Sequence, residues 1–148
     1  MIEPSQDDDL AERLLRIQRA AYRVEASLIR DDRIPGLHEK VEELCTAPLN
    51  WAGAFNGDHA LVGAVAWTED ADSVDIDRLV VDPVVHRQGT GRTLVQAVLS
   101  QAAHRPTTVS TGRSNVPALT LYRGLGFQEL HNTEVLPGLW VTHFEFMP

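Results

Sequence analysis

Apolar residues recur at every third or fourth position through the first long segment of the chain. From Asp9 to Ile29 this spacing predicts an amphipathic helix, and the acidic run at residues 7–9 is expected to cap its N-terminus. The segment HEKVEELC predicts a shorter second helix, which Pro48 ends. The apolar stripe expected on the first helix consists of Leu10, Leu14, Ile17, Ala21, Val24 and Leu28.

The pattern then changes to the alternation that is typical of strands. Two strands are predicted on either side of Asn56-Gly57, a dipeptide that tolerates the positive φ of a tight hairpin turn. Trp51 and Trp67 lie in these strands and are expected in the core. A turn in EDADS leads to a third strand, VDIDRLVVDP. We therefore expect a meander of three antiparallel strands.

The third strand changes the parity of its apolar residues halfway along. Val74 and Ile76 occupy alternate positions, but Leu79 and Val81 fall on the opposite parity. A strand has a period of two, so one face stays apolar only if an extra residue is inserted. We therefore expect a β-bulge near Asp77 or Arg78. The alternative is a strand that is buried on both faces beyond Ile76.

Helices and strands alternate in the second half of the chain. A turn with two glycines precedes a helix from about Thr90 to Ala103, and the short strand TTVST follows. A further helix, capped by Ser114 or Asn115, runs through SNVPALTLYRGLGF, and a final hairpin turns at Pro137-Gly138. The N-terminal MIEP offers at most a stub of strand. This succession requires crossovers onto one sheet, so we expect an α/β fold with a mixed sheet.

Composition narrows the classes of function. The 148 residues include 13 Lys and Arg against 21 Asp and Glu, and the formal charge of −8 makes nucleic acid an unexpected ligand. The acidic N-terminus lacks a signal peptide's apolar run, and no segment is apolar enough to predict a membrane span. Cys45 is the only cysteine, so no intrachain disulfide can form, and we expect one domain in the cytoplasm.

The glycine turn before the Thr90 helix is the expected anion site. The first amides of a helix lack intrahelical partners, and the helix dipole adds positive charge there. Gly89 and Gly91 leave these amides accessible, while Arg87 and Arg92 add positive charge in an acidic chain. The spelling GTGRTL fits neither a P-loop nor a dinucleotide fingerprint. The alternative is an ordinary strand-to-helix turn without a ligand.

Two motifs resemble those of the GNAT-type N-acetyltransferase superfamily. The segment LVVDPVVHRQGTGRTL is similar to the family's bulged strand and to its pyrophosphate loop, Q/R-x-x-G-x-G/A. The segment NVPALTLYRGLGF matches the family pattern N-x-x-A-x-x-x-Y-x-x-x-G-F at every specified position. His86 stands where the family usually has Arg or Gln, which implies that backbone amides make most of the phosphate contact.

The resemblance implies a single GNAT-like α/β domain over residues 1–148. Its central sheet would be twisted and mixed, mostly antiparallel, with a bulged central strand that splays from its neighbour and about four flanking helices. It also implies acetyl-CoA as the co-substrate, held by the open strand, the amides of the glycine turn and an asparagine. The implied cofactor-binding residues are Leu79, Val80, Val81, His86, Arg87, Gln88, Gly89, Thr90, Gly91, Arg92 and Asn115.

The resemblance also places Tyr122 near the thioester sulfur, as the general acid. Deprotonation of the amine is the larger chemical problem, so a base is expected as well. Asp77 is the first choice and Asp75 the second, on the strand beside the thioester. The alternatives are a relay of water molecules, or an Asp77 that is only solvated or paired with Arg78. A backbone N–H freed by the bulge is a candidate donor to the oxyanion.

The acceptor is expected to be a primary amine of a small molecule or peptide. In the resembling family its pocket lies between the connection of the first two helices and the final hairpin. No histidine spacing predicts a metal, and a homodimer is left open. A domain that binds acyl-CoA without turnover is the alternative to an N-acetyltransferase. The residues that would suit a cation with an apolar body are Asp31, Asp32, Glu39, Glu134 and Trp140.

Overall fold

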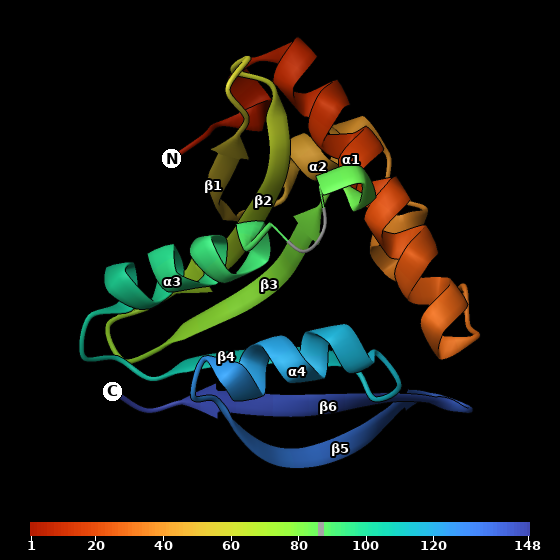
Figure 1. The fold of residues 1–148 in the computed structure, drawn as a ribbon, viewed down its shortest axis with the longest axis vertical. Coiled ribbons are helices and arrows are strands. Elements are labelled where there is room, and N and C mark those ends of the chain that lie inside the picture. The colour runs from red at the N-terminus through yellow and green to blue at the C-terminus, as the bar shows by residue number, and fades with distance from the viewer. Residues whose placement is uncertain (86–87) are drawn as a thin grey trace.

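One six-stranded sheet runs through the protein, in the spatial order β1-β2-β3-β4-β6-β5 (Figure 1). The computed structural model describes residues 1–85 and 88–148. The strands are β1 (Asn50–Phe55), β2 (Leu61–Glu69), β3 (Val74–Val81), β4 (Thr107–Gly112), β5 (Gln128–Leu136) and β6 (Leu139–Phe146). The α-helices of the described residues are α1 (Asp8–Ile29), α2 (Val41–Thr46), α3 (Thr90–Ala102) and α4 (Val116–Gly124).

The sheet is mixed and mostly antiparallel. β1, β2 and β3 form the predicted antiparallel meander. β3 and β4 run parallel and are joined across α3, whereas β6 lies between β4 and β5, antiparallel to both. Near the N-terminus, Ile2 makes an isolated antiparallel bridge to Trp51, which is the stub of strand expected there. The predicted α/β fold is therefore confirmed.

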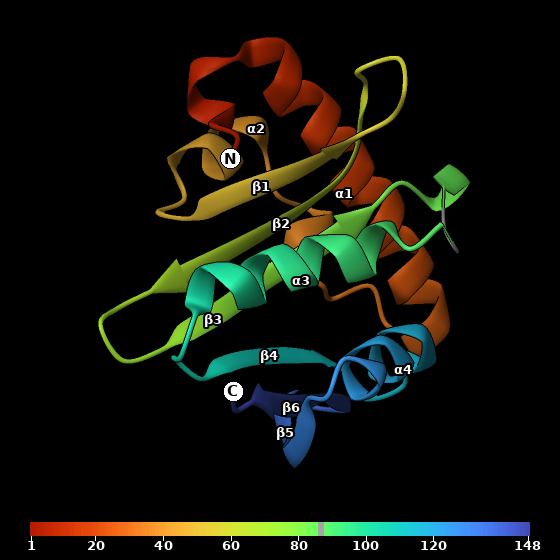
Figure 2. The ribbon, with the colours of Figure 1, turned by 60° about the vertical axis from the view of Figure 1, so that its left-hand side comes forward.

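Helices cover both faces of the sheet (Figure 2). On one face α1 and α2 pack against β1, β2 and β3 through a core that includes Leu14, Trp51 and Val80. On the other face α3 and α4 pack through a second core, which includes Val98 and Phe144. Of the described helices, none is long and apolar enough to cross a membrane.

β3 contains the predicted bulge. Along the β2–β3 pair, Ala66 lies opposite Arg78 and Trp67 lies opposite Ile76. Asp77 is therefore the extra residue, which shifts the register of the strand by one. This shift explains how apolar residues of both parities can face the core of α3 and α4.

Beyond the bulge, β3 packs on both faces. Leu79 and Val81 pack, partly buried, against the core of α3 and α4. Val80 is buried in the core of α1 and α2. The predicted bulge is thus confirmed, whereas burial on both faces is only partial, because Leu79 and Val81 stay partly exposed.

β3 and β4 separate where the bulge begins. Across the described chain they pair only through Val74–Ile76 and Thr107–Val109. β4 then continues to Gly112 beside β6. The edge of residues 77–81 that faces β4 consequently lacks a strand partner, and such an edge can accept a ligand's amide groups as a further strand would.

The turn between β1 and β2 differs from the tight turn predicted at Asn56-Gly57. The connection spans residues 56–60, and the positive φ, 61°, falls on His59 instead of Gly57. The Asn56 Oδ1 accepts hydrogen bonds from two amides of the loop, at 2.9 and 3.0 Å. An asparagine side chain that bonds its own loop in this way stabilises a longer connection.

α1 begins as predicted, but the end of its apolar stripe stays uncovered. Asp7 caps the helix, since its Oδ1 accepts from the Leu10 amide at 3.1 Å. The stripe packs into the core along the first half of the helix, whereas Val24 and Leu28 are 47% and 43% exposed. These two side chains line a pocket.

Candidate active site

α3 begins at a glycine in the left-handed conformation. Gly89 is the N-cap and has a φ of 75°, which favours glycine. It offers no side chain to cap the helix, so the amides of the first turn remain donors for an anion. His86 and Arg87, which are also predicted to contact the pyrophosphate, lie outside the described residues.

A pocket of about 620 Å³ extends from this turn between β3, α4 and α1. Its volume lies in the range of small-molecule sites. Val80 is not in its lining, because it packs in the opposite core, and the exposed Gln88 is not in the lining either. The predicted cofactor residues that line the pocket are Leu79, Val81, Gly89, Thr90, Gly91, Arg92 and Asn115.

Gly91 faces this pocket. A Cβ at this position would lie 3.6 Å from side-chain atoms of Leu79 and Leu121 and 3.8 Å from Val81. All three of these neighbours line the pocket. A larger side chain at Gly91 would therefore fill space that a ligand needs.

Asn115 has a structural role beside the pocket. Its Oδ1 accepts from the Ala118 amide at 3.3 Å, so the residue caps α4 as predicted. Its Nδ2 lies 3.5 Å from the Thr111 Oγ1, to which it donates. The cap orients α4, whose Pro117 and Leu121 also line the pocket. Contact between Asn115 and a cofactor stays a prediction.

Tyr122 lies next to the pocket lining and is not part of it. The residue is 3% exposed, and its ring centroid lies 5.3 Å from that of Phe127 and 5.8 Å from that of Phe144. Burial raises the pKa of the phenol well above its ordinary value, and the negative charge of Glu25 raises it further. Tyr122 therefore keeps its proton at neutral pH, as a general acid must.

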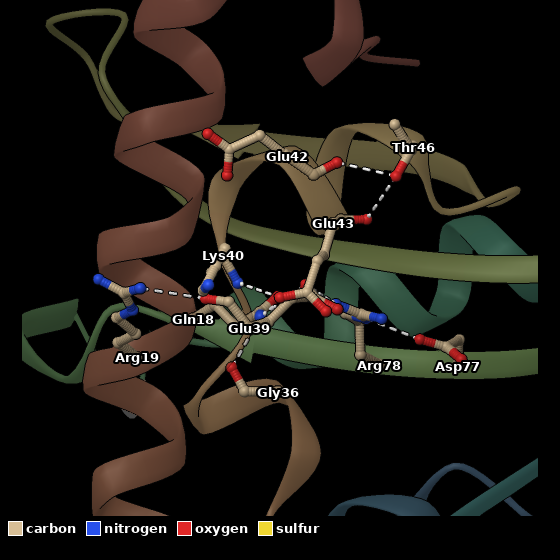
Figure 3. A network of polar contacts seen from close by, with 10 residues as sticks. All are labelled: Gln18, Arg19, Gly36, Glu39, Lys40, Glu42, Glu43, Thr46, Asp77 and Arg78. Atoms are coloured by element: carbon tan, nitrogen blue, oxygen red, sulfur yellow. Dashed lines mark hydrogen bonds and ion pairs between the residues drawn. The ribbon is translucent and has the colours of Figure 1, made fainter.

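The bulge joins Asp77 to a network of polar contacts beside α1 (Figure 3). The Arg78 Nε donates to the Asp77 Oδ2 at 2.6 Å. The Arg78 Nη1 donates to the Glu39 Oε1 at 2.7 Å and to the Gln18 Oε1 at 3.1 Å. Burial alone would lower the pKa of Arg78, but the bonds to Glu39 and Asp77 raise it above its ordinary value. Asp77 is thus ion-paired with Arg78, which is one of the alternatives predicted for it.

Asp75, the second predicted base, is also engaged. Its Oδ1 accepts a hydrogen bond from the Thr108 Oγ1 at 2.6 Å. Neither Asp75 nor Asp77 is in the lining of the pocket. A role for either carboxylate in proton transfer stays a prediction.

The segments predicted to hold the acceptor do meet. The Arg33 Nη2 donates to the Pro137 carbonyl oxygen at 2.7 Å, which joins the connection after α1 to the final hairpin. Asp31 is not free for a cation, because it is ion-paired with Arg33, whose Nη2 lies 2.7 Å from the Asp31 Oδ2 and whose hydrogen bonds lower the Asp31 pKa to about 2. Glu134 accepts from a turn amide at 3.2 Å, and an arginine stacks 4.7 Å above the Trp140 ring. Most of the predicted acceptor groups are thus engaged within the protein.

Sequence reasoning misses two ionisable residues of the pocket, Tyr22 and Glu25 on α1. Burial raises the pKa of Tyr22, and the positive charge of Arg78 opposes that rise. Burial also raises the pKa of Glu25, against hydrogen bonds from the Asn115 side chain and the Gly112 backbone. The pocket therefore contains a carboxylate with an altered proton affinity, which is common at functional sites.

The sequence does contain a signal for Glu25. The residue lies between Val24 and Leu28, inside the apolar stripe predicted for the first helix. A carboxylate is seldom buried without a partner, so its place in such a stripe indicates a specific contact. Within the described residues, no group of three or more His, Cys, Asp or Glu is placed to hold a metal ion.

The mixed sheet, its bulged strand and the glycine turn together define the GNAT-like class of α/β fold. Residues 47–147 match the family model described as an acetyltransferase (GNAT) domain. The chain therefore belongs to the GNAT acetyltransferase family, and the resemblance of its two motifs is confirmed.

A relative among curated proteins is the UPF0157 protein YqkA of Bacillus subtilis (strain 168). It is 32% identical over 140 residues, which cover 94% of this chain and 40% of the relative. The chain thus spans about two fifths of the length of the curated relative it matches.

Solved structures of acetyltransferases share the fold. The PaiA N-acetyltransferase of Thermoplasma acidophilum, in complex with coenzyme A, has a TM-score of 0.69 at 17% identity, and the match covers 94% of each chain. The ribosomal-protein-S18-alanine N-acetyltransferase of Escherichia coli has a TM-score of 0.73 at 16% identity, with 93% of this chain and 86% of that one covered. An aminoglycoside 6'-acetyltransferase type Ii has a TM-score of 0.72 at 17% identity, with 97% and 92% covered.

Proposed function

We propose that the chain is an acetyl-CoA-dependent N-acetyltransferase that transfers an acetyl group directly to a primary amine. The observation that carries this proposal is the pocket that joins the first amides of α3 to the unpaired edge of β3. Similar folds include a complex with coenzyme A and, from Elizabethkingia anophelis, a complex with acetyl-CoA.

The residues of the pocket suit this co-substrate. The amides of residues 89–92 and the Arg92 side chain would bind the pyrophosphate, together with His86 and Arg87 from the sequence motif. The backbone of residues 79–81 would pair with the amides of the pantetheine arm. Leu79 and Val81 would exclude water around the arm. The bound co-substrate supplies an activated acetyl group.

Tyr122 is the proposed general acid. Its hydroxyl would donate a proton to the departing thiolate, which resembles a thiol of pKa ~8.5 and is already a fair leaving group. The contribution of Tyr122 to the rate is therefore moderate.

Deprotonation of the amine is a larger barrier than protonation of the departing thiolate. An alkylamine of pKa ~10.4 is almost fully protonated at pH 7, and its deprotonation costs ~4.6 kcal/mol. Asp77 is the base that the sequence predicts, acting directly or through water. Its carboxylate is, however, ion-paired with Arg78, whose Nε lies 2.6 Å from the Asp77 Oδ2.

The proposed acceptor is a primary amine of a small molecule or of a peptide. The net charge of −8 favours a cation over an anion. The fold is shared by an aminoglycoside acetyltransferase and by a ribosomal-protein N-acetyltransferase, so it accommodates acceptors of both sizes. The lone cysteine of the chain supports a reducing compartment such as the cytoplasm.

Binding and turnover test this function separately. Acetyl-CoA at 100 times its Kd should stabilise the protein by about 2.7 kcal/mol, which is roughly 5–11 °C in Tm for a chain of this size. Incubation with acetyl-CoA and a panel of alkylamines, amino-acid amides and peptides should release thiol above the amine-free rate. Absence of a Tm shift at saturating acetyl-CoA contradicts every function that uses this cofactor.

A binding domain without turnover is the second candidate. The observation that favours it is the ion pair of Asp77 with Arg78, which occupies the expected base. A clear Tm shift with acetyl-CoA but no thiol release with any amine would support this second function.

A further inference from the structure

Glu25 is a carboxylate in the wall of the pocket. It lies on α1 between Val24 and Leu28, which line the same pocket. The Asn115 side chain and the Gly112 backbone lie close enough to its carboxylate to oppose the rise of its pKa. A Cβ at Gly112 would stand 3.5 Å from the Glu25 Oε1, so the carboxylate lies beside the end of β4. The carboxylate therefore lies beside the N-cap of α4 and the end of β4.

Two tyrosines lie close to Glu25. Tyr122 on α4 is near enough that the charge of Glu25 raises the pKa of its phenol. The same charge acts on Tyr22, which lies one turn earlier on α1. Glu25 thus lines the pocket and lies near the proposed acid. The other charged groups that act on Tyr22 or line this pocket are Arg78, Asp77, Glu39 and Arg92.

The surroundings of Glu25 suit proton transfer better than those of Asp77. Burial raises the pKa of Glu25 above its ordinary 4.5, and the two hydrogen bonds oppose this rise only in part. A carboxylate of raised pKa is the stronger proton acceptor. Asp77, by contrast, accepts from the Arg78 Nε at 2.6 Å and does not line the pocket.

We propose that Glu25 is the general base of the acetyl transfer, an inference that rests on the proposed N-acetyltransferase function. An alkylammonium acceptor gives one proton to the Glu25 carboxylate, and the nitrogen lone pair forms the C–N bond to the thioester carbonyl carbon. The C–S bond breaks, and the thiolate takes the proton of the Tyr122 hydroxyl. The phenolate then takes the second proton from the nitrogen. The products are an amide, a thiol and a protonated Glu25, which returns its proton to water.

Substitution of Glu25 tests this role through the pH dependence of the rate. In the wild type, kcat should rise with pH as the base loses its proton. Glu25→Gln should lose that rise and lower kcat by about 100-fold or more. Its Kd for acetyl-CoA should stay within about twofold, because the amide has nearly the same shape as the carboxylate and leaves the wall of the pocket unchanged. Glu25→Asp, which retains a carboxylate, should recover part of the rate.

Two matched variants serve as controls. Glu12→Gln changes an exposed carboxylate on the same helix and should leave the rate unchanged. Asp77→Asn should lower kcat by less than about 10-fold and retain the rise of the rate with pH. A larger loss in Asp77→Asn than in Glu25→Gln overturns the proposal in favour of Asp77.

Thermal stability offers a readout that does not depend on turnover. Because the folded-state pKa of Glu25 is raised, its contribution to stability is complete below pH 4.5 and is lost as the pH rises through the folded pKa. Glu25→Gln should therefore match the Tm of the wild type at pH 4 and exceed it at pH 8. A variant that is less stable than the wild type at pH 8 assigns Glu25 to structure alone and overturns the proposal.

Different experimental results would overturn the role of Glu25 and the proposed function. A wild type that releases no thiol with any amine overturns the proposed function, and the base with it. An active wild type whose Glu25→Gln variant keeps both its rate and its pH profile overturns only the role of Glu25.

Discussion

Packing holds Tyr122 on several sides, so its hydroxyl can be removed without loss of the ring contacts to Phe127 and Phe144. Tyr122→Phe should therefore keep the stability of the wild type within about 1 kcal/mol. Its kcat should fall by about 100-fold, because the departing thiolate loses its proton donor. Single-turnover thiol release and thermal unfolding of the same preparation check both expectations. An unchanged rate would remove Tyr122 from the mechanism.

The glycine turn provides a second test on single residues. Gly91→Val places a branched side chain between Leu79 and Leu121 and should weaken coenzyme A binding by at least about 10-fold. His86→Ala should weaken it less, because the backbone amides are expected to make most of the phosphate contact. Gly57→Val is the control, since a Cβ there meets no atom within 4 Å. Calorimetric titration with coenzyme A measures all three, and the reverse order would contradict backbone binding.

Among the secondary-structure elements, the Arg78 network connects β3 to α1 and to the segment before α2 (Figure 3). The Arg78 and Glu39 side chains are only 11% and 15% exposed. Arg78→Met would leave Glu39 buried beside Gln18 without its counter-charge, so it should lower the free energy of unfolding by about 3–5 kcal/mol. Urea unfolding measures this loss.

An exposed ion pair supplies the control for that experiment. Arg123 and Glu129 form a pair whose side chains are 56% and 44% exposed. Arg123→Met should cost less than about 1 kcal/mol, because water screens such pairs. The double variant of Arg78→Met with Glu39→Gln should recover part of the first loss. Equal costs for the two arginine variants would contradict a stabilising role for the network.

Local patterns predict the elements of this fold well, and they predict contacts between distant segments poorly. The parity change in VDIDRLVV predicts the bulge at Asp77, because alternation is a property of neighbouring residues. The bond of Gln18 to Arg78 joins residues 60 positions apart, and no local pattern reports it. The exposed end of α1 is missed for a related reason, because an apolar stripe does not distinguish a core from a pocket.

The parts of the candidate site that depend on local backbone conformation can be predicted from the sequence. The glycine turn and the N-cap at Asn115 follow from local conformational preferences, and the structure has both. The proposed role of Glu25 depends on a helix that packs across the pocket from another part of the chain, and the sequence does not show which pocket this helix lines.

On the scale of the whole molecule, the charge of −8 should influence how each substrate arrives. An increase in ionic strength from 0.01 to 0.15 M shortens the Debye length from about 30 Å to about 8 Å. The kcat/KM for a cationic amine should then fall by about 2- to 10-fold, because the attraction is screened. A diamine should show a steeper fall than a monoamine of the same length in steady-state assays over this range. A dependence of opposite sign would show that the local charge at the site outweighs that of the whole molecule.

The uneven burial of α1 has a consequence for how this chain can diverge. The first half of the helix is constrained by its packing, with Leu14 fully buried, whereas Val24 and Leu28 are about half exposed. Substitutions at these two positions remove little buried area, so they cost little stability, yet they change the wall of the pocket. Descendants of this chain can therefore acquire new acceptors through one half of one helix and inherit the sheet unaltered.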